Sequence, residues 1–283
     1  MNPYAARLAT QSPMTDPGPF ATLYDLLPAD LPTLCHIVRG LVRHRGMGWL
    51  YGYMVPEDEK AEADTREVAL ILQRILQRDP APLASPRDWD HKFVGYCRVS
   101  AVLLCSMARA KGLTICARAG FSAYAGQGIG QQNWDHWICE YWQATHQRWV
   151  LIDPEEEERI QEVEGVHFDP YDIPRHLFVT PGEAWLACRQ GQADPQQFGL
   201  DEAHAGFPYI RAQLLRDVAA MQHWEATVLD CWGLGAMADE ELTLSELALL
   251  DQVARVAARG PDSLSELHQL YMEHPRLRAP YVS

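Results

Sequence analysis

The sequence has no apolar run long enough to cross a membrane and no excess of basic residues. Its apolar stretches fall short of the roughly 18 uninterrupted residues that a membrane helix requires. There are 38 acidic residues against 24 basic ones, which gives a formal net charge of −14. Because an acidic surface repels phosphate backbones and anionic lipids, we expect neither nucleic acid nor a membrane as a partner. The first 20 residues also lack the basic and then apolar pattern of a secretory signal, so we expect a cytoplasmic protein.

The seven cysteines do not have the pattern of a disulfide framework or of a structural zinc site. Their number is odd, and none lies in a Cys-x-x-Cys pair. We therefore expect free thiols, no metal and no other cofactor. The question for function is which thiol is reactive.

The predicted elements follow in the order helix, strands, helices, which indicates an α+β fold rather than alternating βαβ units. We expect a loose arm over residues 1–19 and short helices between 23 and 42, broken by Pro28 and Pro32. A long helix is predicted over 57–79. The chain then divides into an N-terminal arm with helices over 1–56, a core over 57–180 and a helical C-terminal extension over 181–283 packed on that core.

The core has one central helix and three strands. A nearly all-apolar segment over 97–110, closed by Lys111-Gly112, predicts a buried helix. Aromatic and branched residues predict strands at about 113–124, 135–142 and 148–153. In the C-terminal extension, Thr-Leu-Ser-Glu at 243–246 and Ser-Leu-Ser-Glu at 263–266 match the capping box that opens helices.

Cys97 is the strongest candidate for a reactive thiol because it lies at the first turn of the predicted central helix. Unpaired backbone N–H groups and the helix dipole favour an anion there, which lowers the pKa of a thiol. The same N–H groups can hold the oxyanion of a tetrahedral intermediate. Cys105, in the middle of the helix, has neither advantage. The alternative is that Cys97 is a small core residue.

His136 and Asp153 lie on the two strands of a predicted hairpin. A four-residue turn over 143–146 places His136 directly across from Asp153 on one face, close enough for a carboxylate to bind an imidazole N–H. A slip of one residue would turn Asp153 to the other face. Together with Cys97, these residues form a Cys-His-Asp set suited to acyl transfer through a thioester.

Four segments resemble the transglutaminase-like superfamily, which is related to papain-type cysteine enzymes. They are Gly-Tyr-Cys-Arg at 95–98, the segment 110–118, His-Trp-Ile-Cys-Glu-Tyr at 136–141 and Arg-Trp-Val-Leu-Ile-Asp-Pro at 148–154. The resemblance implies a papain-like core with a catalytic triad of Cys97, His136 and Asp153. It also implies a cysteine hydrolase or acyltransferase that acts on an amide, with a peptide, a protein or a small amide as substrate. We expect hydrolysis rather than amine transfer because water needs no dedicated site.

Trp89 and His91, shortly before Cys97, are candidates for substrate binding or for an oxyanion donor, and Trp137 is a candidate wall of the acyl-binding groove. No glutamine of the papain type directly precedes Cys97. The alternative function is therefore a catalytically inactive binding or assembly module that retains the scaffold. The four acidic residues at 155–158 have the pattern of a solvated surface.

Overall fold

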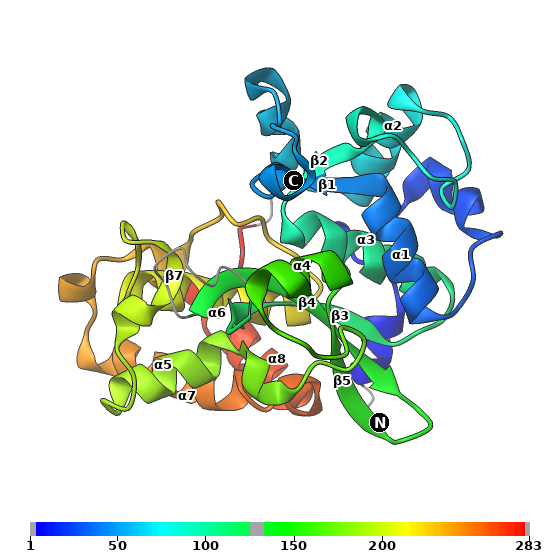
Figure 1. Ribbon diagram of the computed structural model, residues 1–283. Coiled ribbons are helices and arrows are strands. Elements are labelled where there is room, and N and C mark those ends of the chain that lie inside the picture. The colour runs from blue at the N-terminus through cyan, green and yellow to red at the C-terminus, as the bar shows by residue number, and fades with distance from the viewer. Residues whose placement is uncertain (1–3, 125–132, 281–283) are drawn as a thin grey trace.

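The computed structural model describes residues 4–124 and 133–280. Two groups of helices lie on either side of a central set of strands (Figure 1). The helices and strands are, in chain order, α1 (Leu31–Leu41), β1 (Val42–His44), α2 (Val68–Arg78), β2 (Phe93–Gly95), α3 (Cys97–Ala110), β3 (Ile115–Ser122), β4 (Asn133–Gln143), β5 (Arg148–Ile152), α4 (Glu158–Glu164), β6 (Phe178–Val179), α5 (Pro181–Arg189), β7 (Phe198–Asp201), β8 (His204–Ala205), α6 (Phe207–Met221), α7 (Leu244–Ala257) and α8 (Leu264–Glu273).

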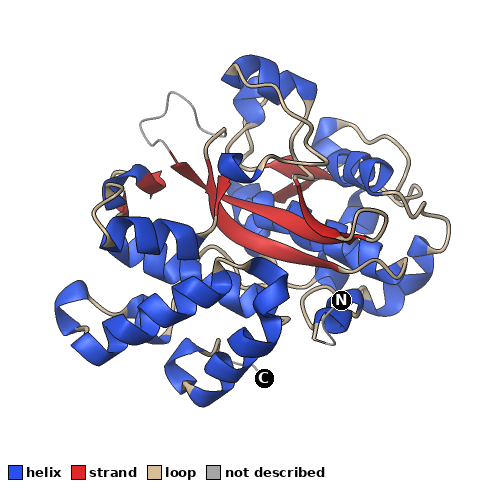
Figure 2. Cartoon of the chain, turned by 90° about the horizontal axis from the view of Figure 1, so that it is seen from below, coloured by secondary structure: helices blue, strands red, loops and turns tan. Residues whose placement is uncertain are grey.

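The α+β class is confirmed, and the sheet is mixed. Its strand order is β6-β3-β4-β7-β8, with β5 also paired to β4. Figure 2 shows the strands in red with helices around them. Strands β3 and β5 run antiparallel to β4, whereas β7 runs parallel to it. Strands β1 and β2 form a separate parallel pair. The three strands predicted from the sequence are β3, β4 and β5, each within two residues of the expected bounds.

The segment before α1 is packed against the domain, so the prediction of a loose arm is wrong. Ala5 and Leu8 are buried in the same cluster as the C-terminal helices. Ser12 donates a hydrogen bond to Glu225 at 2.6 Å. This contact joins residues that are 213 positions apart, which no local pattern could indicate.

The single helix predicted over 57–79 is also wrong. A 3-10 helix over Glu57–Asp64 ends at Thr65, and α2 begins only at Val68. The acidic 3-10 segment buries only Ala63, so no apolar stripe holds it against the core as a continuous helix would be held. Pro32 lies in the first turn of α1, where proline is favoured, and therefore opens this helix instead of breaking it.

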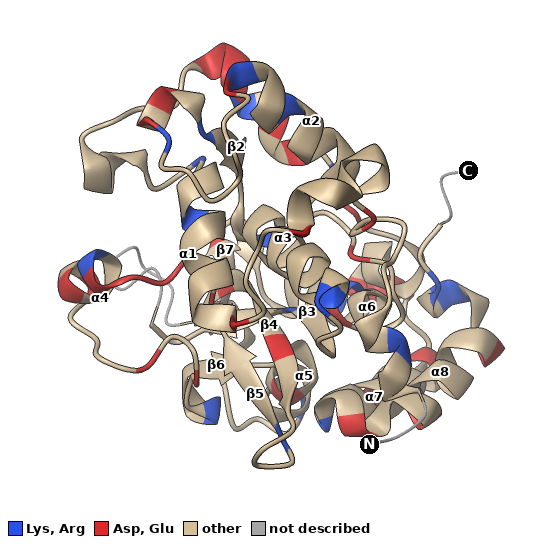
Figure 3. Ribbon diagram, turned by 90° about the vertical axis from the view of Figure 1, so that its right-hand side faces the viewer, with Lys and Arg blue, Asp and Glu red and all other residues tan. Residues whose placement is uncertain are grey.

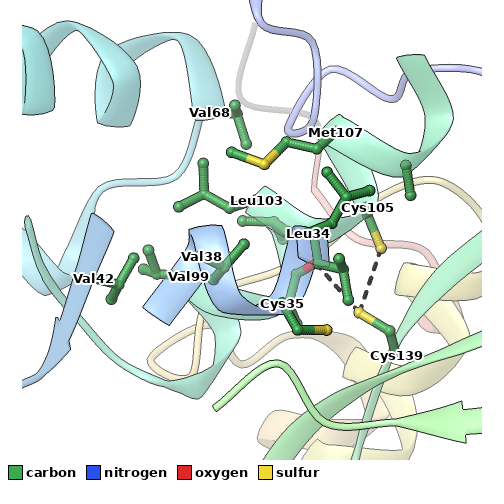
Figure 4. Packing of buried hydrophobic residues seen from close by; sticks show 14 of the residues in the cluster. Leu34, Cys35, Val38, Val42, Val68, Val99, Leu103, Cys105, Met107 and Cys139 are labelled. Atoms are coloured by element: carbon green, nitrogen blue, oxygen red, sulfur yellow. Dashed lines mark hydrogen bonds between the residues drawn. The ribbon is translucent and has the colours of Figure 1, made fainter. Parts of the chain in front are cut away.

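Helix α3 has the bounds and the burial predicted from its apolar sequence. It forms the centre of a cluster with α1, α2 and strands β3 to β5, part of which is drawn in Figure 4. Gly95 permits the close approach of β1, β2 and the first turn of α3. A Cβ atom at Gly95 would lie 2.9 Å from side-chain atoms of both Val42 and Val99.

The C-terminal helices form a second buried cluster around α6. A buried ion network ties this cluster to the sheet, because Arg118 of β3 binds Asp217 of α6 at 2.8 Å and also pairs with Glu140 of β4. The capping box at Thr243 is confirmed. The one at Ser263 is wrong, because its hydroxyl donates to backbone carbonyls before α8.

Charged residues lie mainly on outer elements, among them α4 and the segment before α2, whereas α1 carries only Arg39 (Figure 3). Across residues 4–124 and 133–280, no helix combines the length and the apolar character that crossing a membrane would take.

Candidate active site

The hairpin between β4 and β5 has a turn one residue later than the predicted one. Gln143 pairs with Arg148, so the turn spans 144–147 rather than 143–146. Gln147 has a positive φ of 51°, a conformation suited to a turn and not to a strand. The predicted turn over 143–146 is therefore wrong by one residue.

This register changes how His136 and Asp153 meet. Extended by one pair beyond Ile152, the ladder places Asp153 across from Ile138 and not across from His136. His136 lies two residues further along and is a diagonal neighbour of Asp153. Since side chains alternate with a period of two, the shift leaves both side chains on the same side of the hairpin.

One edge of β4 is open beside His136. Strand β5 covers this edge from Cys139 onward, and β7 covers it at Asn133 and Trp134. Between these two neighbours, residues 135–138 have no ladder partner on this edge in the described part of the chain. The gap leaves room for Asp153, which turns away from β5 at its end.

Asp153 holds the imidazole of His136 in place. The Nε2–H of His136 donates to Oδ2 of Asp153 at 2.7 Å. The hydroxyl of Tyr124 donates to the same carboxylate oxygen, and the backbone N–H of Glu155 donates to Oδ1, each at 2.8 Å. The carboxylate is fully buried, and these donors replace the water that it loses.

The pKa values of this pair are shifted in opposite directions. Burial disfavours the charged ring, but the charge and the hydrogen bond of Asp153 outweigh it and raise the pKa of His136 well above its ordinary value. Burial also opposes ionisation of Asp153, and the imidazolium outweighs it, so the pKa of that carboxyl is lowered. The two groups therefore form a buried ion pair.

Cys97 is the first residue of α3 and lies on the same pocket as His136, close enough for the two side chains to shift each other's pKa. Because Nε2 is taken by Asp153, Nδ1 is the ring nitrogen left for the thiol. Tyr96, the N-cap residue, makes no side-chain capping bond, so no side chain covers the N–H groups of the first turn. Burial raises the pKa of Cys97, whereas the hydrogen bond from His136 lowers it. The lowered pKa predicted from helix position alone is therefore wrong, because burial prevails.

Cys97 and His136 line one pocket of about 780 Å³. Its walls come from the segment after β1, the segment after β5, and residues 200–237. A volume of this size suits a small-molecule or chain-end substrate. All seven cysteines are free thiols, and of these only Cys97 lies beside an imidazole and a carboxylate; Cys231 is exposed on the same pocket.

Three predicted substrate-binding residues lie away from this pocket. Trp89 lies in a neighbouring cavity with Tyr51 and Lys92, and His91 is absent from the described lining of both. Trp137 is fully buried in the core around α3. The prediction that these three residues line the pocket is wrong. Trp89 and His91 lie in the segment before β2, outside the described lining, and Trp137 packs into the core.

Two pocket residues were missed from the sequence. His44, at the end of β1, accepts the N–H of Gly46 at Nδ1 over 3.1 Å, so its neutral ring carries the proton on Nε2. Burial lowers the pKa of His44, which favours that neutral form. No local signal marks this residue, because the parallel pairing of β1 with β2 brings it beside Gly95, two positions before Cys97.

Glu156 is the second missed residue, and the prediction of a solvated acidic run fails for it. It is only 3% exposed, and its Oε1 has no hydrogen-bond partner among the described residues. Burial and the charge of Asp153 raise its pKa to about 9. Glu156 is therefore neutral at pH 7.

Among the described residues, no cluster of three or more His, Cys, Asp or Glu side chains has the arrangement of a metal site. Comparisons with protein-family models, with curated proteins and with solved structures give no match.

Proposed function

We propose that the protein is a cysteine enzyme that cleaves or transfers at an amide carbonyl through a thioester on Cys97. The observation that carries this proposal is the contact of His136 with Cys97 on one side and with Asp153, at 2.7 Å, on the other. A helix that begins at the cysteine and packs on an antiparallel hairpin with the histidine supports a transglutaminase-like, papain-like core. The open pocket gives a substrate access to the thiol.

In the first half-reaction, the sulfur of Cys97 attacks the carbonyl carbon as a thiolate whose proton resides on the ring of His136. A C–S bond forms, and the carbonyl π electrons move to the oxygen. When the intermediate collapses, the C–N bond breaks and the departing nitrogen takes the proton from His136. The products are a free amine and an acyl thioester on Cys97.

In the second half-reaction, a water molecule attacks the thioester and gives its proton to His136. The C–S bond then breaks, and the carboxylic acid leaves. A primary amine in place of water would give a new amide by the same steps. We favour hydrolysis because water needs no dedicated site.

Two groups are placed to stabilise the oxyanion. The N–H groups in the first turn of α3 begin at Cys97, and the N-cap residue Tyr96 makes no side-chain capping bond. His44 lines the same pocket from β1 and carries its proton on Nε2. We assign His44 the role that a glutamine fills in papain-like enzymes. This removes the reason to prefer an inactive scaffold.

The proposal is tested with p-nitrophenyl acetate as a small acyl donor. We expect a burst of p-nitrophenol and an acetyl group mapped to Cys97 by mass spectrometry, both lost in Cys97→Ala. Cys231→Ala is the matched control, because Cys231 is an exposed thiol on the same pocket and should not be needed. Acetylation that persists in Cys97→Ala, or none in the wild type, would overturn the proposal and leave the binding-module alternative.

Hydrolysis and amine transfer are separated in a second experiment. The enzyme is incubated with a glutamine-containing peptide and a labelled primary amine. We expect more glutamate than amide product. An excess of labelled amide would reverse the preference for hydrolysis.

A further inference from the structure

The pocket beside Cys97 exposes large apolar side chains to solvent. Trp49, Leu200 and Leu229 are 57%, 40% and 67% exposed, and all three line it. Large apolar side chains on one concave surface indicate a binding site for an apolar group.

Several further apolar residues lie on the wall formed by residues 200–237. Val228 and Met237 lie on it together with Leu200 and Leu229, and Ala212 of α6 belongs to the same wall. A small side chain at position 212 leaves depth between the larger ones. This wall belongs to the pocket that holds the sulfur of Cys97, so a group bound there is attached to, or next to, the reacting carbonyl.

Among the described lining residues, Arg216 is the one arginine, and it is held by hydrogen bonds to neutral groups. Arg216 is 5% exposed and donates to the carbonyl of Asp230 and to Gln213. His204 is bound to Asp201 at 2.8 Å. Because Arg216 is nearly buried, it presents little surface to a carboxylate or a phosphate on a substrate, and no lysine is among the described lining residues.

Four acidic residues line the pocket, Asp135, Glu155, Glu156 and Glu164, and two of them are held by the hydrogen bonds that follow. Asp135 accepts hydrogen bonds from Tyr209 and Gln213. Glu155 accepts one from Ser100 in the first turn of α3. Carboxylates on the pocket disfavour an anionic group at the acyl end of a substrate.

We infer that the wall formed by residues 200–237 binds an uncharged aliphatic acyl chain, so that the acyl donor is an amide of a medium-chain fatty acid. This inference rests on the proposed function for the reaction, but the ligand class rests on the pocket alone. The chain lies along Leu200, Val228 and Leu229, and its carbonyl reaches Cys97.

Binding is tested without turnover in the Cys97→Ala protein. The neutral fluorescent probe N-phenyl-1-naphthylamine is titrated into it, and octanamide is added as competitor. We expect saturable binding that octanamide displaces. In the Leu229→Glu background, the dissociation constant for octanamide should rise roughly tenfold or more. Leu26→Glu is the matched control, because Leu26 is 94% exposed and does not line the pocket.

Acyl preference is tested with p-nitrophenyl acetate, octanoate and hydrogen succinate on the wild type. We expect acylation of Cys97 to be roughly tenfold or more faster with octanoate than with acetate, and slowest with the anionic succinate. Leu229→Glu should remove most of the advantage of octanoate over acetate, and Leu26→Glu, outside the pocket, should retain it.

The outcomes separate the two proposals. Octanamide binding without acylation of Cys97 by any ester would overturn the proposed reaction and retain the apolar ligand. Acylation of Cys97 at the same rate for acetate and octanoate would overturn the inferred acyl chain and retain the reaction. A lack of octanamide binding, or binding that Leu229→Glu leaves unchanged, would overturn the inference in either case.

Discussion

Helix α3 carries two buried cysteines in different surroundings. Cys97 begins the helix and meets His136, whereas Cys105 lies about 12 Å further along the axis. The sulfur of Cys105 is 3.7 Å from that of Cys139, inside the apolar cluster drawn in Figure 4. One thiol thus has a proton acceptor and a pocket, and the other has only a second thiol.

Burial alone therefore does not decide whether a cysteine can act as a nucleophile. Cys97 and Cys105 are 6% and 0% exposed, so both count as core residues. Burial raises the pKa of Cys97, and likewise that of Cys139 beside Cys105. Only at Cys97 does an imidazole, held by a carboxylate, oppose this effect.

The largest expected effect is the difference in turnover between two single variants, Cys97→Ala and Cys105→Ala. Cys97→Ala should lower turnover of p-nitrophenyl esters by about a thousandfold or more, because no other nucleophile lies beside His136. Cys105→Ala should change turnover by less than about fivefold while lowering stability. Steady-state kinetics and thermal denaturation of both variants measure this, and equal losses of activity would erase the contrast.

The next largest effect concerns the group that orients His136. Asp153→Asn should lower kcat by roughly a hundredfold or more with little change in KM, because an amide cannot hold the imidazolium. Tyr124→Phe is the matched variant, since it removes one donor to the carboxylate at 2.8 Å and leaves the negative charge. It should cost only a few-fold, and a loss as large as that of Asp153→Asn would assign the main role to the hydroxyl.

A smaller effect is expected at the oxyanion donor. His44→Ala should lower kcat by about tenfold to a hundredfold and leave KM nearly unchanged, because its Nε2–H acts mainly in the transition state. Partial recovery is expected in His44→Gln, which restores a donor. His204→Ala is the control, since His204 lines the same pocket but is bound to Asp201; an equal loss there would show that the effect is not specific.

The smallest effect is on stability. Burial raises the pKa of Glu156 from 4.5 to about 9, so the folded protein retains a proton that the unfolded chain releases above pH 4.5. The free energy of unfolding therefore falls as the pH rises from 4.5 toward 9. Glu156→Gln has no proton to release and therefore lacks this fall in the free energy of unfolding. It should stabilise the protein by roughly 1–3 kcal/mol at pH 8 but not at pH 4.

Urea denaturation at both pH values measures the effect. Glu158→Gln changes an exposed carboxylate in the same acidic run and is the control. A stabilisation by Glu156→Gln that is equal at pH 4 and pH 8 would contradict a proton held by the fold.

Local pattern was enough to predict α3, its first residue and the side of the hairpin shared by His136 and Asp153. The apolar run specifies the helix, and the strand period of two tolerates an even error in register. The walls of the pocket come from residues 44–49, 155–164 and 200–237, which only tertiary packing brings together. That is why His44 and Glu156 were missed and Trp137 was misplaced.

The most direct test of the account is the rate at which iodoacetamide alkylates Cys97 as a function of pH. Because the hydrogen bond from His136 lowers a pKa that burial raises, the wild-type inflection should lie at lower pH than that of His136→Gln. Peptide mapping keeps Cys97 separate from Cys105 and Cys231. We expect His136→Gln to move the pH profile of Cys97 alkylation to higher pH and to leave the profiles of Cys105 and Cys231 unchanged. An identical Cys97 profile in the wild type and in His136→Gln would contradict a role of His136 in activating the thiol.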